Sequence, residues 1–361
     1  MRKKITPFFL TVFFWIGIIF FLLYIPFIFQ LFETKRSINV CMWSGVIDPK
    51  VFVDFERETG IHVNASYFEG NDELIVKVLA TKGKGYDMIV PSDYAVSFFS
   101  KHGLLKKIDH KKLNFMDKIN PVFLDHWFDP LNCYSIPAEW YVLGLVIDRR
   151  HFIDMLPPAS WLTLFEPAKV GNYRVGVLND SRELVGLAIT YKYGQLRTIT
   201  QQEIHQLKML LTDQKKHVEA YTDFRGDFLL QSGNCAVAVV ALSMVWKTLK
   251  ENPSLMFLLP EEGTFLGLEN YAILESSTKE DLVYQFMNYL FRLDVQKHNF
   301  QKKVFLSTRL DADFITEEPL LKSCLKAIGT SGQEGGGMVK PFKNVLTDEQ
   351  VNELWMSVKG F

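Results

Sequence analysis

The stretch that decides the fold spans residues 86–94 and reads Tyr86-Asp87-Met88-Ile89-Val90-Pro91-Ser92-Asp93-Tyr94. Residues 88–90 predict a short buried strand that ends at Pro91, and a helical pattern begins near Ala95. In an open α/β sheet, ligands bind beyond the carboxyl ends of strands, beside free helix N-termini. Ser92 and Tyr94 stand at such a place. On these residues alone, however, a turn with a helix cap at Ser92 or Asp93 is the favoured interpretation.

The neighbouring segments alternate between strands and helices, which is typical of a parallel sheet. Strands are predicted over residues 37–43, 61–67, 141–148, 173–178 and 270–275, and helices over 49–59, 73–81, 179–193, 279–290 and 347–358. At 361 residues the chain is long enough for two domains with separate cores. No clear linker separates them, so we expect an α/β protein of two lobes whose chain crosses between lobes within the strands.

The N-terminus carries an apolar run. Residues 5–32 hold no charge and follow Arg2-Lys3-Lys4. A bilayer core is crossed by about 20 apolar residues, and no small-x-small cleavage site follows the run. We predict that residues 1–36 form an uncleaved membrane anchor, with a cleaved signal peptide as the alternative. The charge distribution places the body outside the cytoplasm.

Composition excludes several classes of function. A net charge of -1 gives no basic surplus for nucleic acid. The chain has no GxSxG, HExxH, P-loop or GxGxxG motif, and its eight histidines lack metal-ligand spacing. The four cysteines are Cys41, Cys133, Cys235 and Cys324, without a CxxC pair; disulfides and buried thiols both remain open. We predict no enzyme, no metal and no cofactor.

Acidic side chains are the candidates for binding. Asp180 and Glu183 lie on one helical face and could hold an ammonium group, although the same spacing is that of a capping box. Glu269 stands at the edge of an apolar run; the alternative is an ordinary exposed glutamate near a turn. The aromatic residues that could surround a cation are Trp43, Tyr94, Trp140 and Phe265, but each could equally belong to a core.

Taken in order, these segments resemble the spermidine/putrescine-binding proteins of polyamine ABC transporters, from about residue 38 to residue 360. The resemblance is carried by residues 43–44, 55–61, 67–72, 86–94, 107–113, 128–137, 160–161, 180–183 and 260–263. It implies an α/β fold of the two-lobed periplasmic-binding-protein class (type II, venus-flytrap). Lobe 1 would comprise residues 37–145 and 270–312, and lobe 2 residues 146–269 and 313–361.

The resemblance also implies ligand contacts. Matching positions are Trp43, Ser44, Ser92, Tyr94, Asp180 and Glu183; Glu269 stands where the family usually has Asp, and Phe305 where a Tyr is expected. The chain departs from the family at Val46, Ala241 and Gly267, where a Tyr and two Trp would stand. Each lost ring removes about 0.5–2 kcal/mol of cation–π attraction. Either the pocket is wider, or Trp140 and Phe265 refill it, or the ligand is not spermidine.

The implied function is that of an extracytoplasmic solute-binding component of an ABC importer. It would bind a polyamine or similar organic cation between its lobes and present it to permease subunits, from a periplasmic position tethered to the inner membrane. The alternative is a tethered sensor, or a binding protein for another small solute such as an amino acid.

Overall fold

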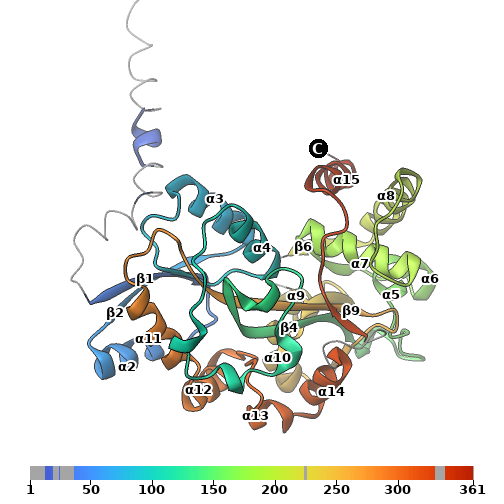
Figure 1. Ribbon diagram of the computed structural model, residues 1–361. Helices are drawn as coiled ribbons and strands as arrows, with labels where there is room; N and C mark the ends of the chain where they lie inside the picture. Colours follow the sequence, from blue (N-terminus) through green and yellow to red (C-terminus); the bar gives the residue numbers. More distant parts are fainter. Residues whose placement is uncertain (1–12, 19–23, 25–35, 223–225, 330–337, 361) are drawn as a thin grey trace, which may run out of the picture. The chain divides into compact units, whose positions relative to one another are not determined.

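A computed structural model describes residues 13–18, 24, 36–222, 226–329 and 338–360 (Figure 1). The described chain forms two compact units. Unit 1 takes in the described residues up to Ile119, with Asp125–Ala138 and Glu269–Phe305. Unit 2 takes in Asn120–Leu124, Glu139–Leu268 and the described residues from Leu306 onward. At two points the chain crosses from one unit to the other inside a long strand. These strands are β4 (Ser135–Asp148) and β9 (Thr264–Ile273). The lobe boundaries expected after residues 145, 269 and 312 stay predictions.

Unit 1 is built on β1 (Ser37–Trp43), which pairs in parallel with β2 (His62–Phe68) and β3 (Met88–Ile89). The strand order is β2-β1-β3-β9. The helices of this unit are α2 (Pro49–Thr59), α11 (Glu280–Leu290) and α12 (Leu293–Lys303) on one side of the strands and α3 (Asn71–Thr81) and α4 (Asp93–Lys101) on the other (Figure 1). The predicted helix over residues 49–59 is confirmed as α2, and its Phe55 is fully buried against Phe286 of α11.

Unit 2 has the strand order β4-β7-β5-β6. Its other strands are β5 (Val175–Leu178), β6 (Val218–Thr222), β7 (Val237–Ala241), β8 (Leu255–Leu258) and β10 (Val339–Pro341). Its helices are α5 (Leu162–Phe165), α6 (Pro167–Val170), α7 (Ser181–Tyr193), α8 (Gln201–Lys215), α9 (Gly226–Gln231), α10 (Leu242–Glu251), α13 (Asp313–Thr316), α14 (Pro319–Ile328) and α15 (Asp348–Lys359). Apolar side chains of α7, α8 and α15 form one core with those of β5 and β7.

The expected parallel pairing is present between β1 and its neighbours β2 and β3 and between β5 and its neighbours β6 and β7, but the sheet also has antiparallel pairs. β9 runs antiparallel to β3, and β4 runs antiparallel to β7 and β8. β4 and β9 are the strands in which the chain passes from one unit to the other. They are therefore not joined to their neighbours by the helical crossovers that force parallel pairing.

The predicted anchor, residues 1–36, lies mostly outside the described residues, which include only 13–18, 24 and 36 of it. In the part of the chain that the structure describes, no helix has both the length and the apolar character needed to cross a bilayer. All four cysteines are free thiols, of which Cys133 alone is partly exposed. Burial raises the pKa of Cys41 to about 11 and that of Cys235 and Cys324 to about 12, so these three thiols are inert core groups.

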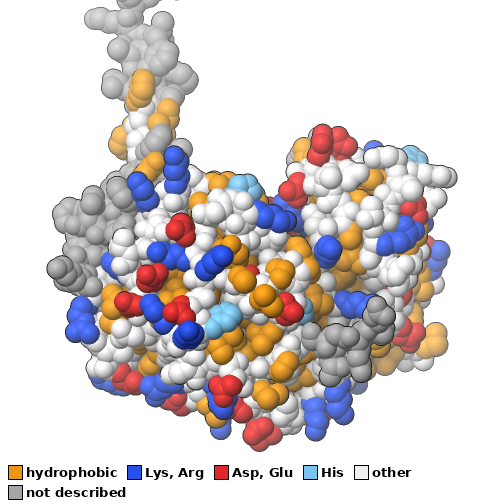
Figure 2. All heavy atoms as spheres, in the orientation of Figure 1, with side chains coloured by type: hydrophobic (Ala, Val, Ile, Leu, Met, Phe, Trp, Pro, Cys, Tyr) orange, Lys and Arg blue, Asp and Glu red, His pale blue; other side chains and the backbone are white. Residues whose placement is uncertain are grey.

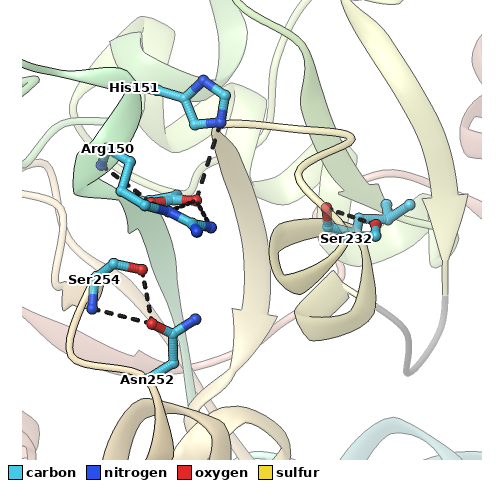
Figure 3. A network of polar contacts seen from close by, with 7 residues as sticks. Arg150, His151, Ser232, Asn252 and Ser254 are labelled. Atoms are coloured by element: carbon cyan, nitrogen blue, oxygen red, sulfur yellow. Dashed lines mark hydrogen bonds and ion pairs between the residues drawn. The ribbon is translucent and has the colours of Figure 1, made fainter.

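The end of β4 is held by a buried carboxylate. Figure 3 shows Arg150 and His151 near this point, with Ser254 and Asn252 close by. Asp148, which has no exposed side-chain surface, accepts hydrogen bonds from the Arg150 backbone at 3.0 Å and its guanidinium at 2.6 Å. Burial would raise the pKa of Asp148, but these bonds outweigh it and hold the pKa below its usual range. The network ends the strand and has a structural role.

Candidate functional site

The centre of the candidate site in unit 1 is the carboxyl group of Glu269 on β9. Its Oε2 accepts a hydrogen bond from Trp43 Nε1 at 2.6 Å, and its Oε1 accepts one from Ser92 Oγ at 2.6 Å. The side chain is 7% exposed. The alternative of an exposed glutamate near a turn is therefore wrong, because two side chains distant in sequence bury this group.

Ser92 occupies the N-cap position of α4 but does not cap the helix with its side chain. Its hydroxyl donates to Glu269 and accepts from Asn71 Nδ2 at 2.9 Å, while its backbone N–H donates to Asn71 Oδ1 at 3.1 Å. The predicted helix cap at Ser92 or Asp93 is thus confirmed in position, at Ser92, but the Ser92 hydroxyl makes no capping hydrogen bond. Its oxygen is already committed to a buried polar network that holds the carboxyl group in place.

The fold explains why these side chains meet. Trp43 is the last residue of β1, Ser92 follows β3, and Asn71 begins the helix after β2. The carboxyl ends of parallel neighbouring strands meet at one sheet edge. β9 passes this edge in the opposite direction, with an antiparallel bridge between Ser92 and Glu269. Only the strand order places an acid from late in the chain beside them.

Burial raises the pKa of the Glu269 carboxyl to about 8. The hydrogen bonds from Ser92 and Trp43 lower the pKa in part, and the nearby charge of Asp93 raises it. The two donors suit a carboxylate, yet at neutral pH the group is mostly protonated. A cation placed beside it would supply the opposite charge that favours ionisation. The arrangement can therefore bind a positively charged group.

The other predicted residues of unit 1 differ in exposure. Trp43 and Tyr94 are half-buried, and the Trp43 ring packs against Phe68 with centroids 4.7 Å apart. Ser44 is exposed, and its N–H donates to the Phe68 carbonyl at 3.4 Å. Phe305 is 2% exposed, inside the core. The structure thus brings Trp43 and Ser92 directly to Glu269, whereas the roles of Ser44, Tyr94 and Phe305 stay predictions.

In unit 2, Asp180 and Glu183 lie at the start of α7 and are both half-buried. Asp180 is the N-cap, and its Oδ1 accepts from the backbone N–H groups of Arg182 and Glu183 at 2.9 Å each. Glu183 Oε1 accepts a hydrogen bond from the Tyr141 hydroxyl at 3.1 Å. The capping interpretation of Asp180 is therefore confirmed. Because each carboxylate has a further oxygen, a second role in binding is compatible with this geometry.

Two variants separate the roles of Asp180. Asp180→Ala removes the cap and is expected to lower the free energy of unfolding by about 1 kcal/mol. Asp180→Asn keeps an oxygen that can accept both N–H groups, so it should unfold at nearly the same urea concentration as the unaltered chain. Weaker ligand binding by Asp180→Asn would then report the lost charge. If Asp180→Asn binds ligand with unchanged affinity, this residue acts only as a cap.

Trp140 and Phe265 do not refill the positions of the missing rings. Trp140 is fully buried, and its Nε1 donates to the Ser307 carbonyl at 3.1 Å. Phe265 is 3% exposed and packs in the core against Phe342, with centroids 5.0 Å apart. Both rings are buried inside unit 2, so of the three alternatives the one in which they refill the pocket is not supported, and the other two stay open.

The positions of the two missing Trp are occupied in different ways. A Cβ atom on Gly267 would lie 1.9 Å from Cζ of Tyr141, so the Tyr141 ring already fills that place. Ala241 lines a small hollow in unit 2 together with Thr222, Gly226, Asp227, Val239, Val240, Met244 and Val245. At position 267 the Tyr141 ring therefore supplies an aromatic surface. At position 241 no ring takes the place of the missing Trp, and a small hollow remains.

Sequence reasoning missed Asn71 and Tyr141. Asn71 directly follows Gly70 at a helix start, where an Asn is ordinarily read as a local cap. Tyr141 is a polar-tipped ring at the start of the apolar run of residues 141–147, which was the available signal. Among the described residues no group of three His, Cys, Asp or Glu side chains could hold a metal. Acidic and basic side chains are interspersed on the face shown in Figure 2, in keeping with the net charge of -1.

Comparison with known proteins identifies the family of the chain. Residues 50–322 match the family model of bacterial extracellular solute-binding proteins. The chain is 27% identical over 257 residues to the spermidine/putrescine-binding periplasmic protein of Salmonella typhimurium, covering 71% of this chain and 72% of the relative. It is also 27% identical over 258 residues to the putrescine/cadaverine-binding protein of Pseudomonas aeruginosa, covering 69% and 72%.

A solved structure shows the same fold. The spermidine/putrescine ABC transporter substrate-binding protein of Streptococcus pneumoniae superposes with a TM-score of 0.75, at 22% identity, over 90% of this chain and 99% of that one. The α/β architecture in two units is thus that of a two-lobed solute-binding protein. Since the family model covers well over half of its residues, this chain belongs to the bacterial extracellular solute-binding proteins.

Proposed function

We propose that this protein binds a polyamine, such as spermidine or putrescine, as the solute-binding component of an ABC importer. The observation that carries the proposal is the buried Glu269 carboxyl, held by Trp43 and Ser92. Charging a buried acid without a positive partner is costly, so the site is completed by a cation. The indole of Trp43 offers an apolar surface for the methylene chain of such a ligand. The polyamine-binding relatives support this ligand class.

We propose further that the carboxylates of Asp180 and Glu183 in unit 2 bind an ammonium group. Ser44, Tyr94 and Phe305 would also contact ligand. A membrane permease would recognise the ligand-bound form. The protein would act in the periplasm, with residues 1–36 as its tether; carbonate extraction of membranes tests this, because a tethered chain stays in the membrane pellet.

Calorimetric titration of the full-length chain in detergent tests the proposed ligand. Spermidine or putrescine is expected to bind with one-to-one stoichiometry. The matched control is 1,4-butanediol, which has the length of putrescine but no charge and is expected not to bind. An amino acid serves as the second control. A folded protein that binds neither amine would overturn the polyamine assignment, and binding of the amino acid alone would favour a different solute.

A further inference from the structure

The side chain of Tyr141 has an unusual position in unit 2. All fourteen residues of β4 are described, and Tyr141 alone among them is not buried. Its ring lies over Gly267 of the neighbouring strand β9. An ideal Cβ on Gly267 would approach the Tyr141 atoms Cζ, Cε1 and OH to 1.9, 2.3 and 2.4 Å. A side chain at position 267 would therefore have to displace the Tyr141 ring from this position.

Gly267 is needed for space rather than for its backbone conformation. Its φ angle lies outside the left-handed region that favours glycine. A ring at position 141 and a side chain at position 267 exclude each other, because both would occupy the same volume. The same space could therefore hold an aromatic ring from β4 or from β9. In this chain the ring comes from β4, as Tyr141.

The ring also has a carboxylate beside it. The Tyr141 hydroxyl donates to Glu183 Oε1 at 3.1 Å, which fixes the ring and the first turn of α7 relative to each other. A partly buried aromatic ring next to a carboxylate attracts an alkylammonium group in two ways, through the ring quadrupole and through the charge. An inorganic cation or a neutral solute would gain less from the ring. The chemistry of the pair is thus that of an organic ammonium site.

We propose that Tyr141 is a specificity-determining residue, which supplies from β4 the aromatic surface for an ammonium group at Glu183 and sets the space available there. This inference rests on the proposed function and deepens it. It concerns which amine is preferred, whereas the proposed function concerns whether amines bind at all.

The test is calorimetric titration of the full-length chain and its variants with spermidine and with putrescine. Tyr141→Leu keeps apolar volume and removes the ring, and it is expected to weaken binding about 2- to 30-fold. Tyr141→Phe keeps the ring and should bind more tightly than Tyr141→Leu. Tyr141→Ala opens the space of a ring, so the ratio of affinities should shift toward the larger spermidine.

A transfer variant provides the sharpest control. In Tyr141→Ala/Gly267→Phe the ring returns from the opposite strand, and binding should be tighter than in Tyr141→Ala alone. A purely structural role would lower the melting temperature while leaving the spermidine-to-putrescine ratio unchanged. An unchanged ratio in Tyr141→Ala, or equal binding by the Phe and Leu variants, would overturn the role of Tyr141 and leave the proposed function standing. If the unaltered chain binds neither amine, both proposals fall.

Discussion

The Glu269→Gln variant is expected to lose most of its affinity for a polyamine. The substitution keeps the shape of the side chain and an oxygen for Ser92 or Trp43, but it removes the charge that a bound ammonium group would meet. Removing one partner of a buried charge pair costs about 2–5 kcal/mol, which corresponds to about 30-fold to several thousandfold in the dissociation constant. Calorimetric titration with spermidine and putrescine measures the change.

The matched control is Glu261→Gln, which removes the same charge from an exposed side chain a few residues earlier in the chain. Its affinity should stay close to that of the unaltered protein, because an exposed charge contributes little. Equal affinities for Glu269→Gln and the unaltered chain would mean that the ammonium group binds elsewhere. Loss of binding in both variants would instead point to a general electrostatic effect.

Polyamine affinity is expected to rise with pH from about 6 to 8, by up to tenfold per unit. The ligand-free Glu269 carboxyl has a pKa of about 8, so below that pH it is mostly neutral. A bound cation favours the carboxylate, and binding must then release a proton. The ligand stays charged over this range, because alkyl amines titrate near the pKa of lysine, about 10.4. Above pH 8 the affinity should level off.

Titrations in buffers of different ionisation enthalpy measure the released proton directly. Glu269→Gln should release none and should show a flat profile. The ligand-free protein offers an independent reading, because Glu269 binds a proton more tightly when folded than when unfolded. Its contribution to stability is complete below the unfolded pKa of about 4.3 and declines as pH rises through about 8. Flat profiles in both experiments would contradict the assigned pKa.

Local sequence was enough to predict much of the secondary structure. β1 covers residues 37–43 and α2 covers residues 49–59, as their periodicity indicated. The first half of β9 was missed, since Gly263 and Gly267 interrupt the strand pattern there. Gly267 is tolerated in a strand because the Tyr141 ring takes the place of its side chain. That compensation comes from a residue on another strand, which local propensity does not contain.

The candidate site shows the same division. Sequence alone singled out Trp43, Ser92 and Glu269, partly through a family resemblance. It could not tell a buried carboxyl from an exposed one, because burial depends on what packs around the residue. Asp180 shows the converse case: its spacing from Glu183 predicted a cap, and the cap is present since it involves only neighbouring residues.

Residues 86–94 show what the local sequence determines and what depends on the tertiary structure. By itself the sequence determined a short strand, its end before Pro91 and a helix predicted to begin near Ala95, which begins at Asp93, because these depend on neighbouring residues. Only the tertiary structure decided what the Ser92 hydroxyl does. Its partners Asn71 and Glu269 lie 21 and 177 positions away in the chain. Glu269 reaches Ser92 because the strand order places β9 beside β3, and Asn71 reaches it from the start of α3, which follows β2 in the same sheet. A buried hydroxyl pairs with the polar groups that surround it.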